Sequence, residues 1–495
     1  MQFISVYFLI FMSLLLIGYY IVPGKFRYLF LLACNILIYL SWITNWGSIF
    51  SIIAVTLITW SGTSLFPKIS EKRLRRTVLI ITSILTVGFL IYFKYAQFFF
   101  ENLNSLFSFL GTEIQVKYRS PFMPIGISFF TFQTLSYVFD VYREKTDVEK
   151  NIFRYAAYAT FFPTILSGPI ERSESLLEQI KNLGSKGFHM QNIRNGMVLT
   201  IWGGYIKYVI VDRFAVISDA VFQSYDSFGT VILCLGAVCY TLQIYCDFIS
   251  YSLIALGLGK MLGIEVTENF NAPYFARSVQ EFWRRWHISL STWFRDYVYI
   301  PLGGSRCSSL HKYRNLFITF LVSGLWHGAN WTFIVWGMIH GISQIIGGAT
   351  VSLKKRLYGV LHIKQDCFSF RLGQRMSTLG LVSFAWIFFR ADSLFIAVNY
   401  IKRMISTPDL WTLFNGALYD LGLDTLQMNI LLISFIVFIT VDYLKYKTHK
   451  NIDILLFEQN YIFYCLAIIL LFLATLVFGM YGPEFNSQEF IYFQF

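Results

Sequence analysis

Charged residues are scarce in this chain of 495 residues: Asp, Glu, Lys and Arg make up 14%, against roughly 25% in soluble proteins. So little charge cannot cover the surface of a soluble protein of this length. Apolar residues make up 56% and aromatic residues 19%, which excludes intrinsic disorder because disordered chains have low hydrophobicity. The composition therefore predicts a protein embedded in a lipid bilayer.

Several other features are missing as well. The seven cysteines form no CxxC pair and most lie in apolar runs, so neither a disulfide framework nor a metal site is indicated. No internal repeat or low-complexity tract is visible, which weakens the case for a transporter built from inverted repeats. Residues 1–21 are apolar but lack a basic start and a small-residue cleavage site, so we expect a membrane span there and no cleavable signal.

The net charge of +12 would suggest nucleic acid as the partner of a soluble protein. In a membrane protein it is better explained by Lys and Arg in cytoplasmic loops, beside anionic lipid, and we expect no nucleic acid. Lys25 and Arg27 separate the first two apolar runs, and basic residues at 72–76 and 445–450 follow the third run and precede the last. Both termini are therefore predicted to be extracytoplasmic, in a bacterial cytoplasmic membrane.

The apolar runs predict an all-α polytopic membrane protein with eleven to thirteen transmembrane helices, some short or re-entrant, because a span needs about 20 apolar residues. Clear candidates are 2–22, 27–44, 47–66, 77–93, 195–215, 228–246, 316–335, 377–390, 427–443 and 460–480. Pro, Gly, Ser or charge interrupts four further candidates, 122–140, 151–168, 247–263 and 331–350.

Residues 264–315 break this pattern, because they are too polar to span and too aromatic for a solvated loop. We expect amphipathic helices along the cytoplasmic interface, with Trp283, Trp286 and Trp293 at head-group depth. On one helix, Trp283 and His287 would share a face. Such a basic and aromatic face could meet a phosphorylated donor from the cytoplasm, or could serve only as an interfacial anchor.

Two of the seven histidines, His327 and His340, stand inside apolar runs. An ionisable side chain in a membrane segment is a functional candidate because its placement there is costly. The alternative is a neutral imidazole bonded to a carbonyl, and we favour this structural role for His340. Gly324 and Gly328 flank His327 and would let backbone or a ligand approach it closely. Asp247, at a span boundary, could orient a histidine.

The chain ends in a dense aromatic tail, 489–495. Such a tail should dock into a groove of this protein or of a partner, because its rings would otherwise be exposed to water. Tyr492 is its one phenol. It is either a hydrogen-bonding anchor or a nucleophile that carries a covalent intermediate.

Several of these segments together resemble the membrane-bound O-acyltransferase family, and in particular its alginate and polysaccharide O-acetylation branch. The resemblance runs from about residue 121 to residue 390 and includes the aromatic tail. The motifs that carry it are residues 123–130, 162–172, 282–291, 299–304, 324–328 and 389–392.

The resemblance implies a ring of helices around a thin centre, where a cytoplasmic tunnel meets an outer funnel. It implies that His327 is the catalytic histidine and His287 a second functional histidine. For the donor we expect contacts from Trp283 and from three arginines that suit phosphate groups, namely Arg284, Arg285 and Arg295. Along the chain we expect N-terminal spans (1–120), a catalytic core (121–392), C-terminal spans (393–480) and the tail (481–495).

The expected reaction moves an acetyl group from a cytoplasmic thioester, acetyl-CoA or another, to a cell-surface or secreted polysaccharide. A two-step route would pass the acetyl group to Tyr492 and then to an extracytoplasmic carrier or acyltransferase, with no permanently bound cofactor. The same mechanism could serve D-alanyl transfer to teichoic acid or peptidoglycan O-acetylation. Alternatives of another class are a transporter or flippase and a scaffold of an export complex.

Overall fold

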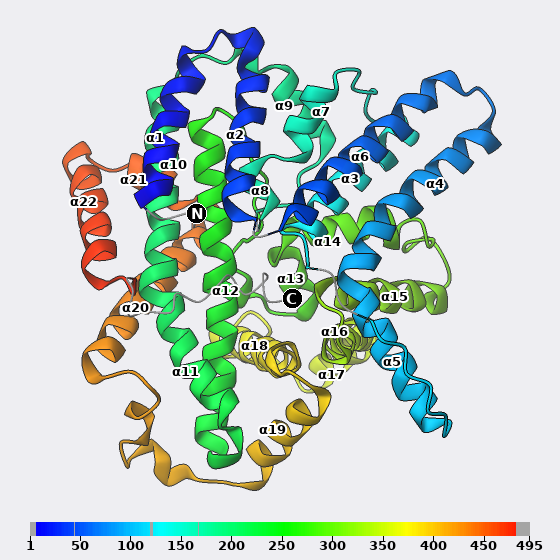
Figure 1. Cartoon of the computed structure of the whole chain (residues 1–495). Coiled ribbons are helices and arrows are strands. Elements are labelled where there is room, and N and C mark those ends of the chain that lie inside the picture. Colours follow the sequence, from blue (N-terminus) through cyan, green and yellow to red (C-terminus); the bar gives the residue numbers. More distant parts are fainter. Residues whose placement is uncertain (1–5, 44, 119–121, 167, 482–495) are drawn as a thin grey trace. The chain divides into compact units, whose positions relative to one another are not determined.

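A computed structural model describes residues 6–43, 45–118, 122–166 and 168–481, and every element of secondary structure in these residues is helical. The predicted all-α class is confirmed. The chain forms two compact units, which are drawn with the chain coloured along its sequence in Figure 1. Unit 1 comprises residues 1–197 and 255–267, and unit 2 comprises residues 198–254 and 268–495.

Unit 1 contains nine complete α-helices, all within the described residues. They are α1 (Val6–Ile21), α2 (Arg27–Trp42), α3 (Trp46–Leu65), α4 (Lys72–Leu90), α5 (Ala96–Phe109), α6 (Ile127–Tyr142), α7 (Ile152–Ala159), α8 (Phe162–Ile165) and α9 (Glu178–Lys181).

In the described part of unit 2, eleven complete α-helices are present. They are α11 (Asp212–Gln223), α13 (Val279–Arg285), α14 (Ile288–Phe294), α15 (Ser309–His327), α16 (Trp331–Ala349), α17 (Val351–Val360), α18 (Phe368–Arg390), α19 (Leu394–Ser406), α20 (Thr425–Thr448), α21 (Ile452–Phe457) and α22 (Tyr461–Phe478).

Two further helices, α10 (Met190–Tyr205) and α12 (Thr230–Met261), contribute residues to both units. The sequence predicts two spans at 228–246 and 247–263, but α12 is one helix of 32 residues, about 48 Å long at 1.5 Å per residue. The prediction of a break at Asp247 is wrong because this carboxylate is buried against Lys207, with 3.0 Å between Nζ and Oδ1. A polar residue with a partner inside the protein does not have to end an apolar helix.

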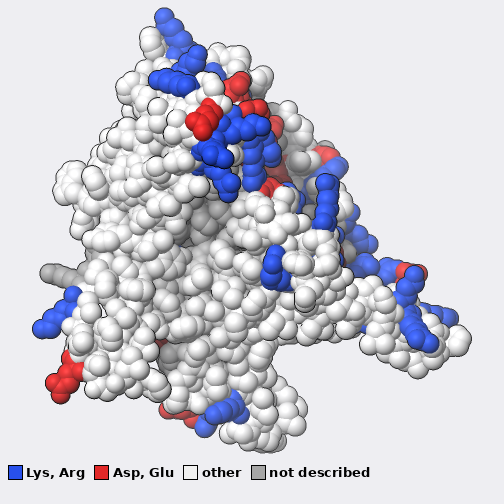
Figure 2. All heavy atoms as spheres, turned by 90° about the vertical axis from the view of Figure 1, so that its right-hand side faces the viewer, with Lys and Arg blue, Asp and Glu red and all other residues white. Residues whose placement is uncertain are grey.

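Apolar helices of membrane-crossing length confirm the polytopic class. Seven such helices occur in the described residues, and Tyr7–Ile21 is a shorter apolar one. On the face shown in Figure 2, uncharged atoms cover broad areas, and Lys and Arg side chains gather in patches. The seven segments are Gly24–Trp42, Trp46–Lys68, Lys72–Phe109, Thr230–Met261, Trp331–Ala349, Thr425–Thr448 and Tyr461–Phe478.

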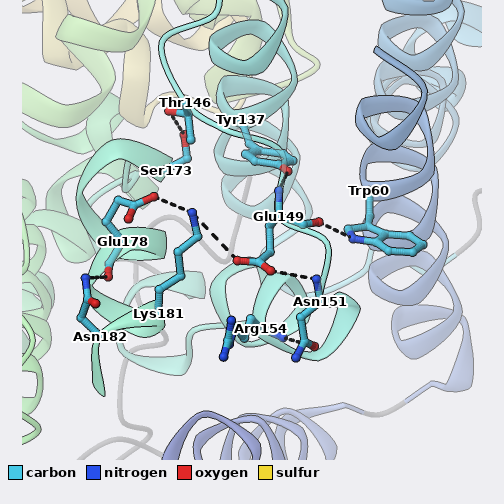
Figure 3. Close-up of polar contacts among 10 residues, drawn as sticks. All are labelled: Trp60, Tyr137, Thr146, Glu149, Asn151, Arg154, Ser173, Glu178, Lys181 and Asn182. Carbon is cyan, nitrogen blue, oxygen red and sulfur yellow. Dashed lines mark hydrogen bonds and ion pairs between the residues drawn. The ribbon is translucent and has the colours of Figure 1, made fainter. Parts of the chain in front are cut away.

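A network of paired charges and hydrogen bonds fixes the loops of unit 1. Figure 3 shows Lys181 between two carboxylates: its Nζ lies 2.6 Å from Glu178 and 3.9 Å from the buried Glu149. The second oxygen of Glu149 accepts the backbone N–H of Asn151 at 2.8 Å, and the backbone N–H of Glu149 donates to the Tyr137 hydroxyl at 2.8 Å. This network joins α6, the loop before α7 and α9, and the charges are paired within the protein.

Unit 2 contains a helical hairpin formed by α15 and α16, which pack against each other (Figure 1). Two glycines let their backbones touch: a Cβ at Gly324 would collide with the Phe333 carbonyl, and one at Gly337 would collide with the Phe320 carbonyl. Only glycine permits so close a crossing. The crossing brings the end of α15, with His327, against the aromatic side chains of α16.

Candidate active site

His327 is the last residue of α15 and is buried, with 2% of its surface exposed. Its imidazole lies among aromatic rings, with centroid distances of 4.9 Å to Trp336, 5.0 Å to Trp326 and 5.3 Å to Phe389. The helix ends there because Gly328 takes an extended conformation. The sequence-predicted catalytic histidine therefore lies in a largely apolar surrounding, where electrostatic interactions are strong.

His287 lies between two short helices and not within one. Helix α13 ends at Arg285 and α14 begins at Ile288, while His287 has a left-handed backbone with φ of 41°. The expectation that Trp283 and His287 share a face of one helix is wrong. The break is held by Asn269, whose carbonyl accepts the Ile288 N–H at 2.9 Å. A left-handed conformation in a residue other than glycine costs energy and is typical of functional sites.

The hydrogen bonds of Asn269 define how His287 is oriented. The Asn269 Oδ1 accepts the backbone N–H and the hydroxyl of Ser289, at 3.3 and 2.6 Å. Because this atom is an acceptor, the His287 Nδ1 that lies 3.4 Å from it carries the proton. Complete burial lowers the pKa of His287 to about 3. The imidazole is therefore neutral near pH 7, with the lone pair on Nε2.

The indole of Trp326 connects the two histidines. Its ring centroid lies 5.0 Å from that of His327 and 6.1 Å from that of His287. Phe248 of α12 also packs against His287, with 4.5 Å between the ring centroids. The fold thus brings together two histidines that are forty residues apart in the sequence. Both lie in unit 2.

Trp283 was selected from the sequence as a donor contact, and its indole N–H donates to Nδ1 of His340 at 3.2 Å. His340 is fully buried among aromatic rings, which agrees with the structural role favoured for it. Trp283, Trp286 and Trp293 are also buried, with 8%, 1% and 5% of their surfaces exposed. Their indoles pack inside the protein and not at its surface, where an interfacial anchor would lie.

The three predicted phosphate-binding arginines have different surroundings. Arg285 is half-buried and its guanidinium lies 2.9 Å from Glu281. Arg284 is exposed. Arg295 is also exposed and pairs with its neighbour Asp296 at 2.8 Å.

Tyr492 lies outside the described residues. Asp247 pairs with Lys207, and a side chain within hydrogen-bond distance of His287 Nδ1 is that of Asn269. Sequence reasoning missed Asn269, because the residue stands eighteen positions before the histidine in a loop without periodicity. It also missed Trp326 as a link, although this residue lies directly beside His327 in the motif.

The described geometry, with two neighbouring buried histidines of which one has a defined tautomer, suits proton transfer to and from a hydroxyl or thiol. Comparison with known proteins agrees. Residues 36–390 match the model of the family described as MBOAT, membrane-bound O-acyltransferase.

Named relatives cover most of the chain. The probable alginate O-acetylase AlgI of Azotobacter vinelandii is 37% identical over 88% of this chain and 83% of its own length. The AlgI of Pseudomonas aeruginosa is 36% identical over 87% of this chain and 80% of its own length. A peptidoglycan O-acetyltransferase of Helicobacter pylori is 32% identical over 67% of this chain and 65% of its own length. The chain is an O-acyltransferase and belongs to the membrane-bound O-acyltransferase family.

Proposed function

We propose that this chain moves an acetyl group from a cytoplasmic thioester, with acetyl-CoA as the first candidate, to a polysaccharide on the other side of the bacterial cytoplasmic membrane. The observation that carries the proposal is the pair of buried histidines, His327 and His287, which both contact the indole of Trp326. The names of two relatives that match 87–88% of this chain, alginate O-acetylases, support acetyl as the acyl group and a polysaccharide as the acceptor.

In the first step a hydroxyl oxygen attacks the thioester carbonyl. His327 takes the hydroxyl proton as general base and returns it to the departing thiolate, so that the donor leaves as a free thiol. We propose Tyr492 as the hydroxyl that forms the first ester, because it is the one phenol in the aromatic tail. A second attack, by a hydroxyl of the acceptor or of an extracytoplasmic carrier, breaks the acetyl-tyrosine ester and restores the phenol.

The roles of the other residues follow from their surroundings. His287 donates from Nδ1 to Asn269, which places the lone pair of the imidazole on Nε2. Basic residues at 72–76 and 445–450 support a cytoplasmic position for those loops. With these loops inside, the residues after α22 lie on the extracytoplasmic side, where a carrier or a separate acyltransferase would collect the acetyl group.

The test is to incubate the purified protein with acetyl-CoA labelled in the acetyl group and to analyse the C-terminal peptide by mass spectrometry. We expect an acetyl adduct on Tyr492 of the wild-type protein and none on Tyr492→Phe, which keeps the ring but removes the nucleophile. Polymer acetylation should be lost in the same variant. Full polymer acetylation by Tyr492→Phe would refute the covalent step, and no label transfer from any thioester would refute the enzyme.

Peptidoglycan is the second candidate acceptor, because one relative at 32% identity is named a peptidoglycan O-acetyltransferase. The acceptor need not touch this chain if a separate protein receives the acetyl group. Chemical analysis of O-acetyl esters in purified exopolysaccharide and in purified peptidoglycan, with and without the functional protein, distinguishes the two candidates.

A further inference from the structure

Three arginines of unit 2 converge on one phenol, Tyr446 in the last turn of α20. The guanidinium carbons of Arg285 and Arg375 lie 5.0 and 5.5 Å from its ring centroid. Arg375 donates to the phenol oxygen at 3.4 Å, and the charge of Arg277 also acts on this side chain. Arg277 precedes α13, Arg285 ends α13, and Arg375 lies in the second turn of α18. The fold therefore assembles this arginine cluster (Arg277, Arg285, Arg375) from three separate segments.

The arginine cluster carries more positive charge than its protein neighbours balance. Glu281 lies 2.9 Å from the Arg285 guanidinium and accepts the backbone N–H of Arg277. In the described part of the chain, no carboxylate lies within ion-pair distance of the guanidinium of Arg277 or Arg375. Both side chains are half-buried, so water screens their charges less than it would at a fully exposed site.

One donor of the cluster also has no partner. Among the described residues, Nε of Arg277 is buried and makes no hydrogen bond. Leaving a buried donor unsatisfied is costly. Stacking on aromatic rings accounts for part of the arrangement, because Arg375 also lies over Phe275 at 6.0 Å. Stacking does not account for the unused N–H, whereas an anion with several acceptor oxygens would satisfy it.

Phosphate is the anion that guanidinium groups recognise best, because their planar set of donors matches two phosphate oxygens at once. The cluster also lies close to the candidate active site along the chain, since Arg285 is two residues from His287 and the intervening Trp286 is buried. A donor held by its phosphate at the arginines could extend its thioester toward the histidines.

We propose that Arg277, Arg285 and Arg375, arranged around Tyr446, bind the phosphate of a phosphorylated pantetheine thioester. The inference rests on the proposed function and identifies the part of the donor that is recognised. Coenzyme A and the prosthetic group of an acyl carrier protein share this chemistry. Of the three arginines that the sequence predicts as donor contacts, the cluster contains only Arg285. Its other two members, Arg277 and Arg375, lie outside the motif at residues 282–291.

The experiment compares three donors: acetyl-CoA, S-acetyl-4′-phosphopantetheine, and S-acetylpantetheine, which has no phosphate. The variants are Arg277→Gln and Arg375→Gln. Arg356→Gln on the exposed side of α17 is the control, because it removes the same charge away from the cluster. Monodispersity and thermal unfolding establish that each variant is folded, and Arg375→Lys retains the charge if the glutamine variant is unstable. Binding of CoA itself is measured by calorimetry, independently of turnover.

We expect Arg277→Gln and Arg375→Gln to raise KM for acetyl-CoA about 10- to 100-fold, as for the loss of a charged hydrogen bond. At saturating donor, kcat should stay near that of the wild type, and KM for S-acetylpantetheine should not change. An equal rise in KM for S-acetyl-4′-phosphopantetheine places the 4′-phosphate in the cluster. A rise in KM for acetyl-CoA alone places the nucleotide phosphates there.

An equal rise in KM for all three donors, or none for any, would overturn the inference and leave the proposed function intact. If the wild type transfers acetyl from none of the donors, the proposed function fails. The calorimetric comparison then decides on the cluster alone: weaker CoA binding by Arg375→Gln supports it, and unchanged or absent binding overturns it.

Discussion

Two polar clusters of this protein both contain charged side chains and a tyrosine, but they differ in whether the charges have ion-pair partners within the protein. In unit 1, Lys181 lies between Glu149 and Glu178, and the remaining oxygen of Glu149 accepts a backbone N–H. In the arginine cluster of unit 2, by contrast, Arg277 and Arg375 have no carboxylate in the described residues within ion-pair distance. Charges that are paired within the protein indicate a structural role, whereas half-buried guanidinium groups without a carboxylate partner indicate a binding site for an anion.

The largest effect is expected when the proposed base of unit 2 is removed. For His327→Ala we expect a loss of acetyl transfer of about 10²- to 10⁴-fold, the usual contribution of a general base. The free energy of unfolding should fall less than it does when a residue of the charged network in unit 1 is replaced. The reason is that the His327 imidazole mainly contacts aromatic rings. Labelled acetyl transfer and thermal unfolding are measured on the same preparation. A folded His327→Ala protein with full activity would refute the assignment.

The paired network of unit 1 should respond in the opposite way, with a loss of stability and no loss of activity. Glu149→Leu leaves the Asn151 N–H without its acceptor and removes one partner of Lys181. We expect the free energy of unfolding to fall by about 2–3 kcal/mol, with no change in KM for acetyl-CoA.

Lys181→Met serves as the partner variant in a double-mutant cycle, which isolates the coupling between the two side chains. The interpretation of this network as structural would be wrong if Glu149→Leu kept its stability but lost affinity for the donor.

Much of the fold and part of the site could be predicted from the sequence. Long apolar runs gave the helical membrane class, and the motif around residue 327 gave a histidine that the structure buries at the end of α15. The break before α14 could not be predicted, because it depends on Asn269, a loop residue whose backbone and side chain both bind that turn. Local periodicity carries no information about such a partner.

The arginine cluster was missed for a related reason. Arg277, Arg285 and Arg375 meet only because α18 and α20 return to the end of α13, and each residue alone is typical of a basic loop. Proximity in sequence selected Arg284 and Arg295, which the structure leaves exposed. A pattern along one helix reports which residues share a face, but not which residues of distant helices share a ligand.

The smallest effect is expected in the pH dependence of unfolding. Burial lowers the pKa of His287 in the folded protein to about 3, below its value of about 6.5 in the unfolded chain. The unfolded state therefore binds the proton more tightly. The stability that the neutral imidazole contributes is fully present above about pH 6.5 and is lost as the pH falls toward 3. Between pH 7 and 4.5 this contribution should fall by about 2 kcal/mol.

The measurement is the change in unfolding free energy between these two pH values, for wild type and for His287→Gln. Glutamine can still donate to Asn269 but does not titrate, so the variant should lose about 2 kcal/mol less than the wild type. His311→Gln is the control, because its imidazole is solvent-exposed in the same unit and should behave like the wild type. An identical pH response of wild type and His287→Gln would mean that burial does not hold the His287 imidazole in its neutral form.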